Sequence, residues 1–268
     1  MSEEDAQKVP EPGTQFIDVE EITVSALYLE GLFDGHPISA ATGFVVTSPR
    51  GPVLCTNWHV VAGRNAFTGQ ILSDKGAIPN QLRIHHRSPT GATVNVPRVE
   101  PLSDDDQPRW IEHPKWRQRV DAVALPLTQI DDKLTLHPVS IDPVPDENAI
   151  DLEVTTPVSI IGYPFGMNTA GVLPIWATGF VASEPSSPEP YIFIDARTRP
   201  GQSGSPVVLH RKAGAIKTRV VGGSLQYRTA STNITQFVGI YSGRYHPESD
   251  LGFVWRASAL REIIANAG

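Results

Sequence analysis

Short apolar runs recur along most of the chain, and turn-forming Gly, Pro, Asn, Asp and Ser residues separate them. In the first half the runs are ITVSALYL, ATGFVVTS, GPVLCTNWHVV, QLRIHH, ATVNVPRV and DAVALPL. In the second half they are VSIIGYP, LPIWATGFVAS, YIFIDAR, GSPVVLH, TRVVGGSL, TQFVGIYSG and LGFVWR. Alternating or β-branched runs at this spacing are typical of strands in a barrel or a sandwich. The pattern therefore predicts an all-β protein with two successive domains of about six strands each.

The C-terminus is the one segment whose pattern is convincingly helical. Ala257, Leu260, Ile263 and Ile264 fall at helical spacing, so we expect a helix there. Together with the acidic start of the chain and a Pro-rich middle stretch, this helix divides the sequence into five expected parts. They are a disordered segment 1–14, an N-terminal β-barrel 15–130, a connector 131–150, a C-terminal β-barrel 151–255 and a C-terminal helix 256–268.

Composition and charge narrow the class of protein. Of the 268 residues, 40% are hydrophobic and 19% are charged, which is typical of a globular protein. A net charge of −7 without a Lys/Arg cluster argues against a nucleic-acid partner. No apolar run approaches the roughly 18 residues of a membrane-spanning helix, and the start MSEEDAQKVPEPG lacks the apolar core of a signal peptide. Because the single cysteine, Cys55, cannot form an intramolecular disulfide, we expect a soluble protein in the reducing cytoplasm.

The segment RTRPGQSGSPVVLH places Ser203 between two glycines at the mouth of an apolar strand. Gly and Ser are common turn residues, so a turn is one interpretation. The other is that Ser203 is a nucleophile, and that the glycines let a substrate and a backbone oxyanion hole approach it. A nucleophile requires a base and an orienting carboxylate elsewhere in the chain, whereas a turn requires neither.

One histidine and one carboxylate fit that requirement. His59 lies in the apolar run VLCTNWHVVAG, whereas the other seven histidines lie in polar surroundings. Asp121 opens the apolar run AVALPL, and a partly buried carboxylate there needs a donor such as an imidazole N–H. Taken singly, a core histidine and a strand-start turn explain these residues equally well. The chain order His59, Asp121, Ser203 is nevertheless one of the few that hydrolytic triads use.

The three blocks TNWHVV, DAVALPL and GQSGSPV resemble the catalytic blocks of the chymotrypsin/trypsin clan of serine proteases. They are most similar to disulfide-free bacterial trypsin-like peptidases, which include HtrA-type proteases and glutamyl endopeptidases. Further similar blocks are IIGYPFG, WATGFVAS and GFVWRASALREII, and the resemblance extends from about residue 25 to residue 265. It implies a chymotrypsin-like fold of two six-stranded antiparallel β-barrels with the active site between them.

The resemblance also implies a serine endopeptidase that works through an acyl-enzyme intermediate. Ser203 would be the nucleophile, His59 the general base and then the general acid, and Asp121 the group that orients the imidazole. The main-chain N–H groups of Gly201 and Ser203 would form the oxyanion hole. The partner would be a protein or peptide substrate, and no cofactor or metal is implied.

Six further positions match the substrate-binding region of the family. They are Arg197, Thr198, Tyr241, Ser242, Gly243 and Gly252. By this resemblance Ser242 would lie beside Asp121 and support its carboxylate, and Ser242 and Gly243 would offer main-chain hydrogen bonds to an extended peptide. If Arg197 points into the specificity pocket, an acidic substrate residue is expected. If it points outward, small or apolar residues are expected.

One departure from the family pattern concerns activation. The residue before the serine is Gln202, not the aspartate that pairs with a newly cut N-terminus in zymogen-activated members. Activation by simple propeptide removal is therefore not expected, and the resemblance to HtrA-type proteases permits control by a regulatory protein partner instead.

Other classes of function fit less well or need separate tests. A latent enzyme or pseudoprotease, a peptide-binding module of the same fold, is the main alternative. An α/β-hydrolase elbow is excluded because it needs a second glycine where Ser205 stands. His85 and His86 are adjacent on a predicted strand and therefore point to opposite faces, which argues against a shared metal. Cys55, in the run GPVLC, is expected to be buried and inert.

Overall fold

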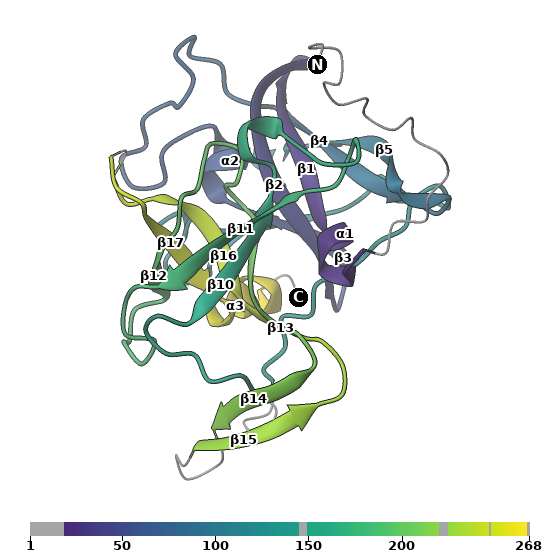
Figure 1. Ribbon diagram of the computed structural model, residues 1–268. Helices are drawn as coiled ribbons and strands as arrows, with labels where there is room; N and C mark the ends of the chain where they lie inside the picture. The colour runs from purple at the N-terminus through teal and green to yellow at the C-terminus, as the bar shows by residue number, and fades with distance from the viewer. Residues whose placement is uncertain (1–18, 145–148, 220–224, 247, 267–268) are drawn as a thin grey trace, which may run out of the picture.

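Strands make up most of the regular structure, and they form two large antiparallel sheets that follow one another along the chain (Figure 1). The computed structural model describes residues 19–144, 149–219, 225–246 and 248–266. The segment 1–14, predicted to be disordered, lies outside these residues. The prediction of a mostly β protein is confirmed.

The first sheet contains seven strands in the spatial order β5-β4-β1-β2-β3-β9-β8. Their bounds are Ala26–Phe33 (β1), His36–Ser48 (β2), Gly51–Thr56 (β3), Gln81–Ser88 (β4), Gly91–Pro101 (β5), Ile111–Glu112 (β8) and Val123–Pro126 (β9). A small hairpin separates β5 from β8, with strands Ser103–Asp104 (β6) and Gln107–Pro108 (β7). The sequence predicted a closed barrel of six strands. Among the described residues no ladder joins the outer strands β5 and β8, and the two-residue strand β8 is too short for an apolar pattern to mark.

The second sheet is a closed barrel of six strands in the order β10-β11-β12-β17-β16-β13, which confirms the prediction for this half. Its strands are Pro157–Gly162 (β10), Ile175–Val181 (β11), Tyr191–Asp195 (β12), Pro206–Arg211 (β13), Ile234–Arg244 (β16) and Leu251–Arg256 (β17). Gly214–Arg219 (β14) and Leu225–Ala230 (β15) form a separate hairpin that projects from the barrel at the bottom of Figure 1. The predicted strand TRVVGGSL lies mostly outside the described residues.

Two short helices stand where the apolar pattern predicted only strands, so the prediction was wrong there. They are Glu21–Ser25 (α1) and Trp58–Ala62 (α2), and each is about one turn long, a length at which periodicity does not separate helix from strand. α2 ends at Gly63, whose φ of 62° and N–H bond to the His59 carbonyl form the left-handed cap that glycine favours. The site histidine therefore lies on a helix that directly follows β3.

The remaining helices are the short 3-10 turn Pro164–Gly166 (η2) and the expected C-terminal helix, Ala257–Ala265 (α3). Across the described ranges, none of the helices has the length and apolar character that crossing a bilayer requires.

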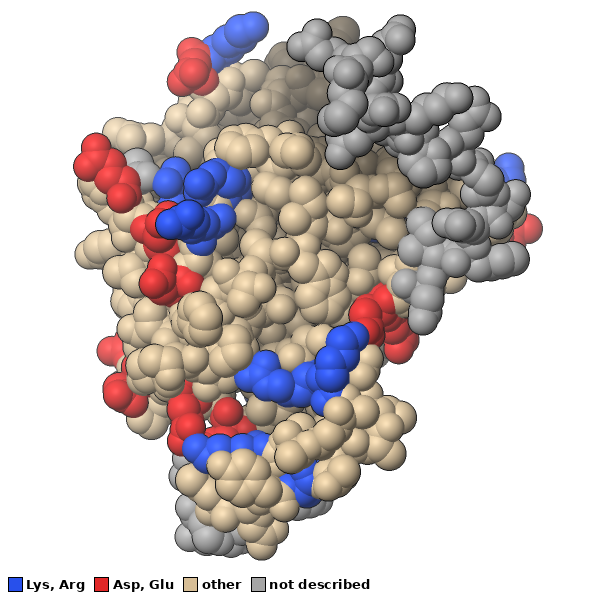
Figure 2. Space-filling view, in the orientation of Figure 1, with Lys and Arg blue, Asp and Glu red and all other residues tan. Residues whose placement is uncertain are grey.

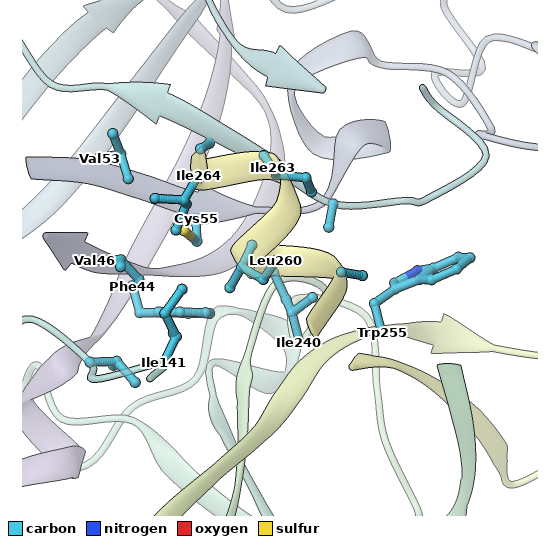
Figure 3. Close-up of a cluster of buried hydrophobic side chains, with 14 of the residues drawn as sticks. Phe44, Val46, Val53, Cys55, Ile141, Ile240, Trp255, Leu260, Ile263 and Ile264 are labelled. Carbon is cyan, nitrogen blue, oxygen red and sulfur yellow. The ribbon is translucent and has the colours of Figure 1, made fainter. Parts of the chain in front are cut away.

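The C-terminal helix lies in a core that both sheets share (Figure 3). Leu260 and Ile263 of α3 pack with Phe44 from the first sheet and with Ile240 and Trp255 from the second. Burying such apolar side chains is the main favourable term in folding. Each sheet also has a core of its own. The shared core fixes the two halves relative to each other, and the groups predicted to act together come from both halves.

On the face shown in Figure 2, basic side chains lie next to acidic ones. These charged groups surround a broad centre without charged side chains. In the molecule as a whole, ion pairs join Lys217 to Glu153 at 2.6 Å and Arg98 to Asp131 at 2.6 Å. Positive charge on this face is therefore dispersed among carboxylates.

Candidate active site

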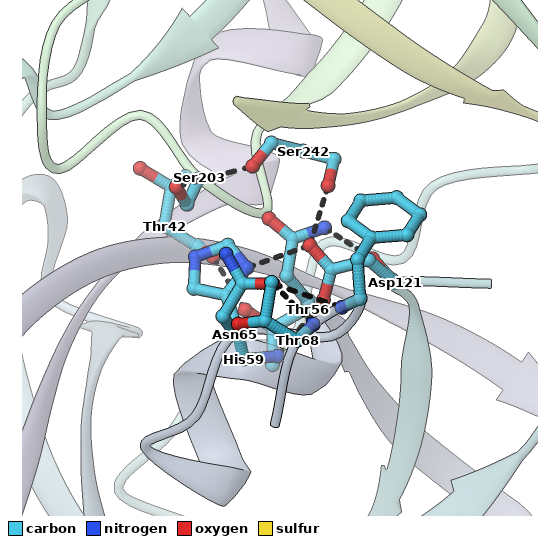
Figure 4. A network of polar contacts seen from close by, with 10 residues as sticks. Thr42, Thr56, His59, Asn65, Thr68, Asp121, Ser203 and Ser242 are labelled. Atoms are coloured by element: carbon cyan, nitrogen blue, oxygen red, sulfur yellow. Dashed lines mark hydrogen bonds and ion pairs between the residues drawn. The ribbon is translucent and has the colours of Figure 1, made fainter. Parts of the chain in front are cut away.

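His59 and Asp121 lie in direct contact between α2 and the start of β9 (Figure 4). Nδ1 of His59 is 2.6 Å from Oδ2 of Asp121, and the main-chain N–H of His59 donates to Oδ1 at 2.9 Å. The amide of Asn57 also donates to the main-chain oxygen of Asp121 at 2.7 Å. The turn of α2 thus presents the ring and the main chain of His59 to one carboxylate.

Ser242 of β16 completes the environment of that carboxylate. Its hydroxyl donates to Oδ2 of Asp121 at 2.5 Å, as the resemblance implied it would. Asp121 is only 3% exposed, and a buried carboxylate is stable only when its oxygens are hydrogen-bonded. Asp121 meets this condition with three donors: the imidazole, a main-chain N–H and a hydroxyl.

The pKa values of the pair shift in opposite directions. Burial alone would raise the pKa of Asp121, but the charge and hydrogen bonds of His59 and the hydroxyl of Ser242 outweigh burial and lower it. Burial alone would lower the pKa of His59, but the charge and hydrogen bond of Asp121 raise it above its usual value. Asp121 is therefore ionised near neutral pH. Nδ1 of a neutral His59 must carry the proton, which leaves Nε2 free to accept one.

Ser203 lies on the segment between β12 and β13 and borders the same small cavity as His59, with a volume of about 130 Å³. Its hydroxyl donates to the main-chain oxygen of Ser242 at 3.5 Å. Within the part of the chain that is described, Ser203 and His59 do not form a hydrogen bond. Such bonds are often long in a free enzyme and tighten when substrate binds.

The glycines around Ser203 have conformations and contacts that only glycine allows. Gly201 has a φ of 96°, and a Cβ there would lie 2.2 Å from the Tyr163 carbonyl oxygen. Gly204 has a φ of 85°, and a Cβ there would lie 2.0 Å from the Thr42 carbonyl oxygen. In the described ranges the N–H groups of Gly201 and Ser203 donate to no protein acceptor. This leaves two main-chain donors beside the Ser203 hydroxyl.

Thr42 of β2 ties the first sheet to this segment, a role that sequence reasoning missed. Its N–H donates to the Ser203 carbonyl at 2.9 Å, and its hydroxyl donates to the Gly201 carbonyl at 2.8 Å. The same hydroxyl accepts the N–H of Tyr163 at 3.1 Å, and its carbonyl accepts the hydroxyl of Thr56 at 2.9 Å. Thr42 is fully buried, and the sequence offers only the weak signal of a threonine within the apolar run ATGFVVTS.

Gln202 turns inward between the two free N–H groups. It is 1% exposed, and its Oε1 accepts the N–H of Arg199 at 2.8 Å. The neutral Gln202 amide is therefore hydrogen-bonded within its own turn, to the main chain of Arg199. Zymogen-activated members carry an aspartate at this position.

The residues predicted to line the specificity pocket are brought together, but most of them are buried. The hydroxyls of Thr198 and Tyr241 are hydrogen-bonded to each other, and the two residues are 0% and 2% exposed. Gly252 lies against the Tyr241 ring, where an added Cβ would be 2.6 Å from Cε2. Arg197, next to Thr198, is exposed. Gly243 lies on β16, next to Ser242.

A second cavity, of about 450 Å³, is also lined by His59, together with Asp121 and Ser242. Three aromatic residues line it: Phe67, Tyr245 and Phe253. Sequence reasoning missed them because they come from two loops and β17, and only folding places them together. Phe67 and Tyr245 are 62% and 64% exposed, so the cavity has an apolar rim that solvent reaches.

Cys55 belongs to the core and not to the site. It is fully buried in β3, as predicted, and burial raises the pKa of its thiol far above the usual range. A buried neutral thiol is a poor nucleophile.

Comparison with known proteins agrees with this fold. A family model described as a trypsin-like peptidase domain matches residues 41–216, which is more than half of the chain. The chain therefore belongs to the trypsin-like peptidases, a family of serine endopeptidases. None of the curated proteins matches it significantly.

Two solved structures illustrate the similarity of fold. The thermostable serine protease AL20 from an extremophilic microorganism has a TM-score of 0.51 and 12% identity, over 92% of this chain and 98% of that one. A serine endoprotease from Yersinia pestis has a TM-score of 0.50 and 12% identity, over 94% of this chain and 67% of that one. At this identity the likeness concerns the fold alone.

Proposed function

We propose that this protein hydrolyses peptide bonds through a triad of His59, Asp121 and Ser203. The observation that carries the proposal is the contact between His59 and the buried, hydrogen-bonded Asp121. Ser203 lies nearby, and its own N–H group and that of Gly201 are free to bind an oxyanion. Ion pairs that serve only stability do not need a neighbouring nucleophile and oxyanion donors.

In the proposed reaction, Oγ of Ser203 attacks the substrate carbonyl carbon while Nε2 of His59 takes the hydroxyl proton. The negative charge that develops on the carbonyl oxygen accepts hydrogen bonds from the N–H groups of Gly201 and Ser203. The C–N bond then breaks, and His59 returns its proton to the leaving amine. Water repeats the sequence on the acyl-enzyme and releases the acid. Asp121 stays ionised and stabilises the imidazolium throughout.

The substrate is proposed to bind as an extended strand along β16. One edge of β16 pairs with β17 as far as Arg244, whereas the opposite edge pairs with β13 only as far as Ile240. The main chain from Ser242 to Arg244 thus has a free edge that adjoins the 450 Å³ cavity. A peptide that adds to this edge gains main-chain hydrogen bonds, and its upstream apolar side chains can occupy the aromatic cavity. The cytoplasmic location and control by a partner stay predictions from the sequence.

One observation favours a second candidate, a latent enzyme or pseudoprotease of the same fold. The Ser203 hydroxyl is directed to the Ser242 carbonyl and not to His59. If this arrangement persisted with substrate bound, the serine would not be activated. The protein would then bind peptides without cleaving them.

Labelling with a fluorophosphonate probe distinguishes the two candidates. We expect covalent labelling of the wild-type protein, loss of labelling in Ser203→Ala, and full labelling in Ser186→Ala, which changes an exposed serine in a remote loop. His59→Ala should also lose labelling, because the serine then has no base. A wild-type protein that binds peptides but takes up no probe would establish the latent form and overturn the proposed hydrolysis.

A further inference from the structure

Three segments surround the place where the side chain before the cleaved bond must go. The acyl carbon has to lie between Oγ of Ser203 and the two free N–H groups. Next to that point lie residues 197–202, the part of β16 that begins at Tyr241, and the start of β17, which pairs with β16. These segments are held together, because Gly204 N–H donates to the Tyr241 carbonyl at 2.8 Å and Ala196 N–H donates to the Asp250 carbonyl at 3.0 Å.

The side chain of Tyr241 lies between these three segments, at the edge of the core of the second barrel. The residue is 2% exposed, and its hydroxyl reaches across to the hydroxyl of Thr198 in the first segment. Its ring lies against Gly252 in the third segment, where even a Cβ would come within 2.6 Å of Cε2. The ring therefore spans the pocket from β16 to both other walls, and glycine at position 252 is what makes room for it.

The two side chains that meet in this space, Thr198 and Tyr241, are both uncharged. Burial raises the pKa of Tyr241 to about 12, so its phenol is neutral at physiological pH. The hydroxyls of Thr198 and Tyr241 satisfy each other, and Arg197 is exposed. A buried charge without a partner is strongly unfavourable. The ring of Tyr241 therefore excludes long side chains, whether they are charged or apolar.

We propose that the pocket admits only small uncharged side chains, such as those of Gly, Ala and Ser, before the cleaved bond, and that Tyr241 sets this limit. The proposal rests on the proposed peptidase function. It identifies the substrate class as peptides with a small residue at the cleavage position.

The test uses reporter peptides that are identical except at the residue before the cleaved bond, with Ala, Ser, Leu, Phe, Glu or Arg there. The wild-type protein should cleave the Ala and Ser peptides with a kcat/KM about tenfold or more above the others, because one misfitting methylene already costs about 10- to 200-fold. Tyr241→Val should gain cleavage after Leu and Phe. Tyr241→Phe keeps the ring and should keep the small-residue preference. Tyr227→Val, which changes a 77% exposed tyrosine on β15, should match the wild type.

The outcomes separate this inference from the function on which it rests. If the probe does not label Ser203 and no peptide is cleaved, the peptidase proposal fails. If the probe labels Ser203 but the wild type cleaves after Leu, Phe, Glu or Arg as well as after Ala, the size limit is wrong while the peptidase proposal stands. A labelled Tyr241→Val variant with an unchanged profile would show that another group sets the limit. The cleavage profile of the wild-type protein alone can overturn the proposal. The proposal therefore stays testable even if Tyr241→Val folds poorly.

Discussion

Ser242 donates its hydroxyl to Oδ2 of Asp121, the same oxygen that lies 2.6 Å from Nδ1 of His59. Its main-chain carbonyl accepts the hydroxyl of Ser203. One residue thus contacts two members of the proposed triad and begins the free edge of β16 on which substrate is proposed to lie (Figure 4). The proposed substrate edge and the proposed base therefore meet at Ser242, whose side chain can be changed without removing its main-chain groups.

Replacing Ser242 by Ala should lower kcat with little effect on KM. A hydrogen bond to a charged group contributes about 1.5–3 kcal/mol, so the expected loss in kcat is about 10- to 100-fold. Ser242→Thr keeps a hydroxyl and should recover most of the activity. Steady-state kinetics of the two variants checks this expectation. An unchanged kcat in Ser242→Ala would mean that the hydroxyl does not help to hold Asp121.

The pH dependence of activity follows from the raised pKa of His59. His59 must be neutral to accept a proton, so kcat/KM should rise with pH through an apparent pKa above the usual 6.5. In Asp121→Asn the charge that raises this pKa is lost, so the acid limb of the profile should move to lower pH. The maximal rate should fall by about 10⁴-fold, because the amide no longer enforces the correct tautomer. A pH profile of each protein measures both effects, and an acid limb that stays in place would contradict the assigned pairing.

The sequence was sufficient to propose the triad because each member lies in a short local pattern, and the contact between His59 and Asp121 agrees with that proposal. Ser203 is marked by its glycines, Asp121 by the apolar strand it opens, and His59 by the apolar run around it. The closed second barrel and α3 were predictable for the same reason, since periodicity over a complete strand or helix is a local signal. The helical turn that carries His59 was not, because an apolar run of five residues is compatible with either structure.

Features that depend on packing between distant segments could not be predicted from local patterns. The Tyr241 ring contacts Gly252 and the Thr198 hydroxyl only after folding, and nothing near Tyr241 in the sequence marks these contacts, so only the family resemblance grouped the three residues. Thr42 became recognisable as the support of the Ser203 segment only once β2 was placed beside that segment. The number of strands in the first sheet depends on pairing of very short segments, which carry almost no periodic signal.

The conformation of Gly201 should be essential for turnover. In Gly201→Ala the new Cβ would lie 2.2 Å from the Tyr163 carbonyl oxygen, so the peptide that presents the Gly201 N–H has to move. Loss of one oxyanion donor costs about 10²–10³ in kcat. Gly171→Ala is the matched control, because Gly171 has a similar φ of 79° but nothing within 4 Å of its Cβ position. The prediction fails if both alanine variants lose activity equally.

The aromatic cavity should contribute to substrate binding and not to the chemical step. Phe67 is 62% exposed, and its ring centroid lies 6.1 Å from that of Phe253 across the cavity. For substrates with apolar residues upstream of the cleaved bond, Phe67→Ala should raise KM about three- to tenfold, as expected for loss of an aromatic contact, and leave kcat nearly unchanged. Tyr227→Ala removes an aromatic ring that is 77% exposed and does not line the cavity, so it should have no effect. A fall in kcat without a change in KM would assign Phe67 to the chemical step instead.

Arg87 of β4 should stabilise the contact between the two halves of the molecule, because it donates hydrogen bonds to both. It is 0% exposed, and its guanidinium donates to the Ala26 carbonyl in the first half at 3.0 Å. In the second half it donates to the Tyr163 hydroxyl at 2.8 Å and the Val172 carbonyl at 3.0 Å. A lysine keeps the charge but has a single nitrogen, so Arg87→Lys would leave several buried acceptors unpaired, each at a cost of about 1–3 kcal/mol.

We therefore expect Arg87→Lys to lower the free energy of unfolding by about 2–4 kcal/mol. Arg83→Lys is the matched control on the same strand, because Arg83 pairs with Glu30 at a position that solvent reaches and should change stability by less than about 1 kcal/mol. Urea unfolding followed by tryptophan fluorescence measures both. If Arg87 only fills space, Arg87→Met should be at least as stable as Arg87→Lys. If Arg87 satisfies the acceptors of both halves, both variants should have a lower free energy of unfolding than the wild type. Arg87→Met should then be the less stable of the two, because lysine can still donate a hydrogen bond to one acceptor and methionine cannot.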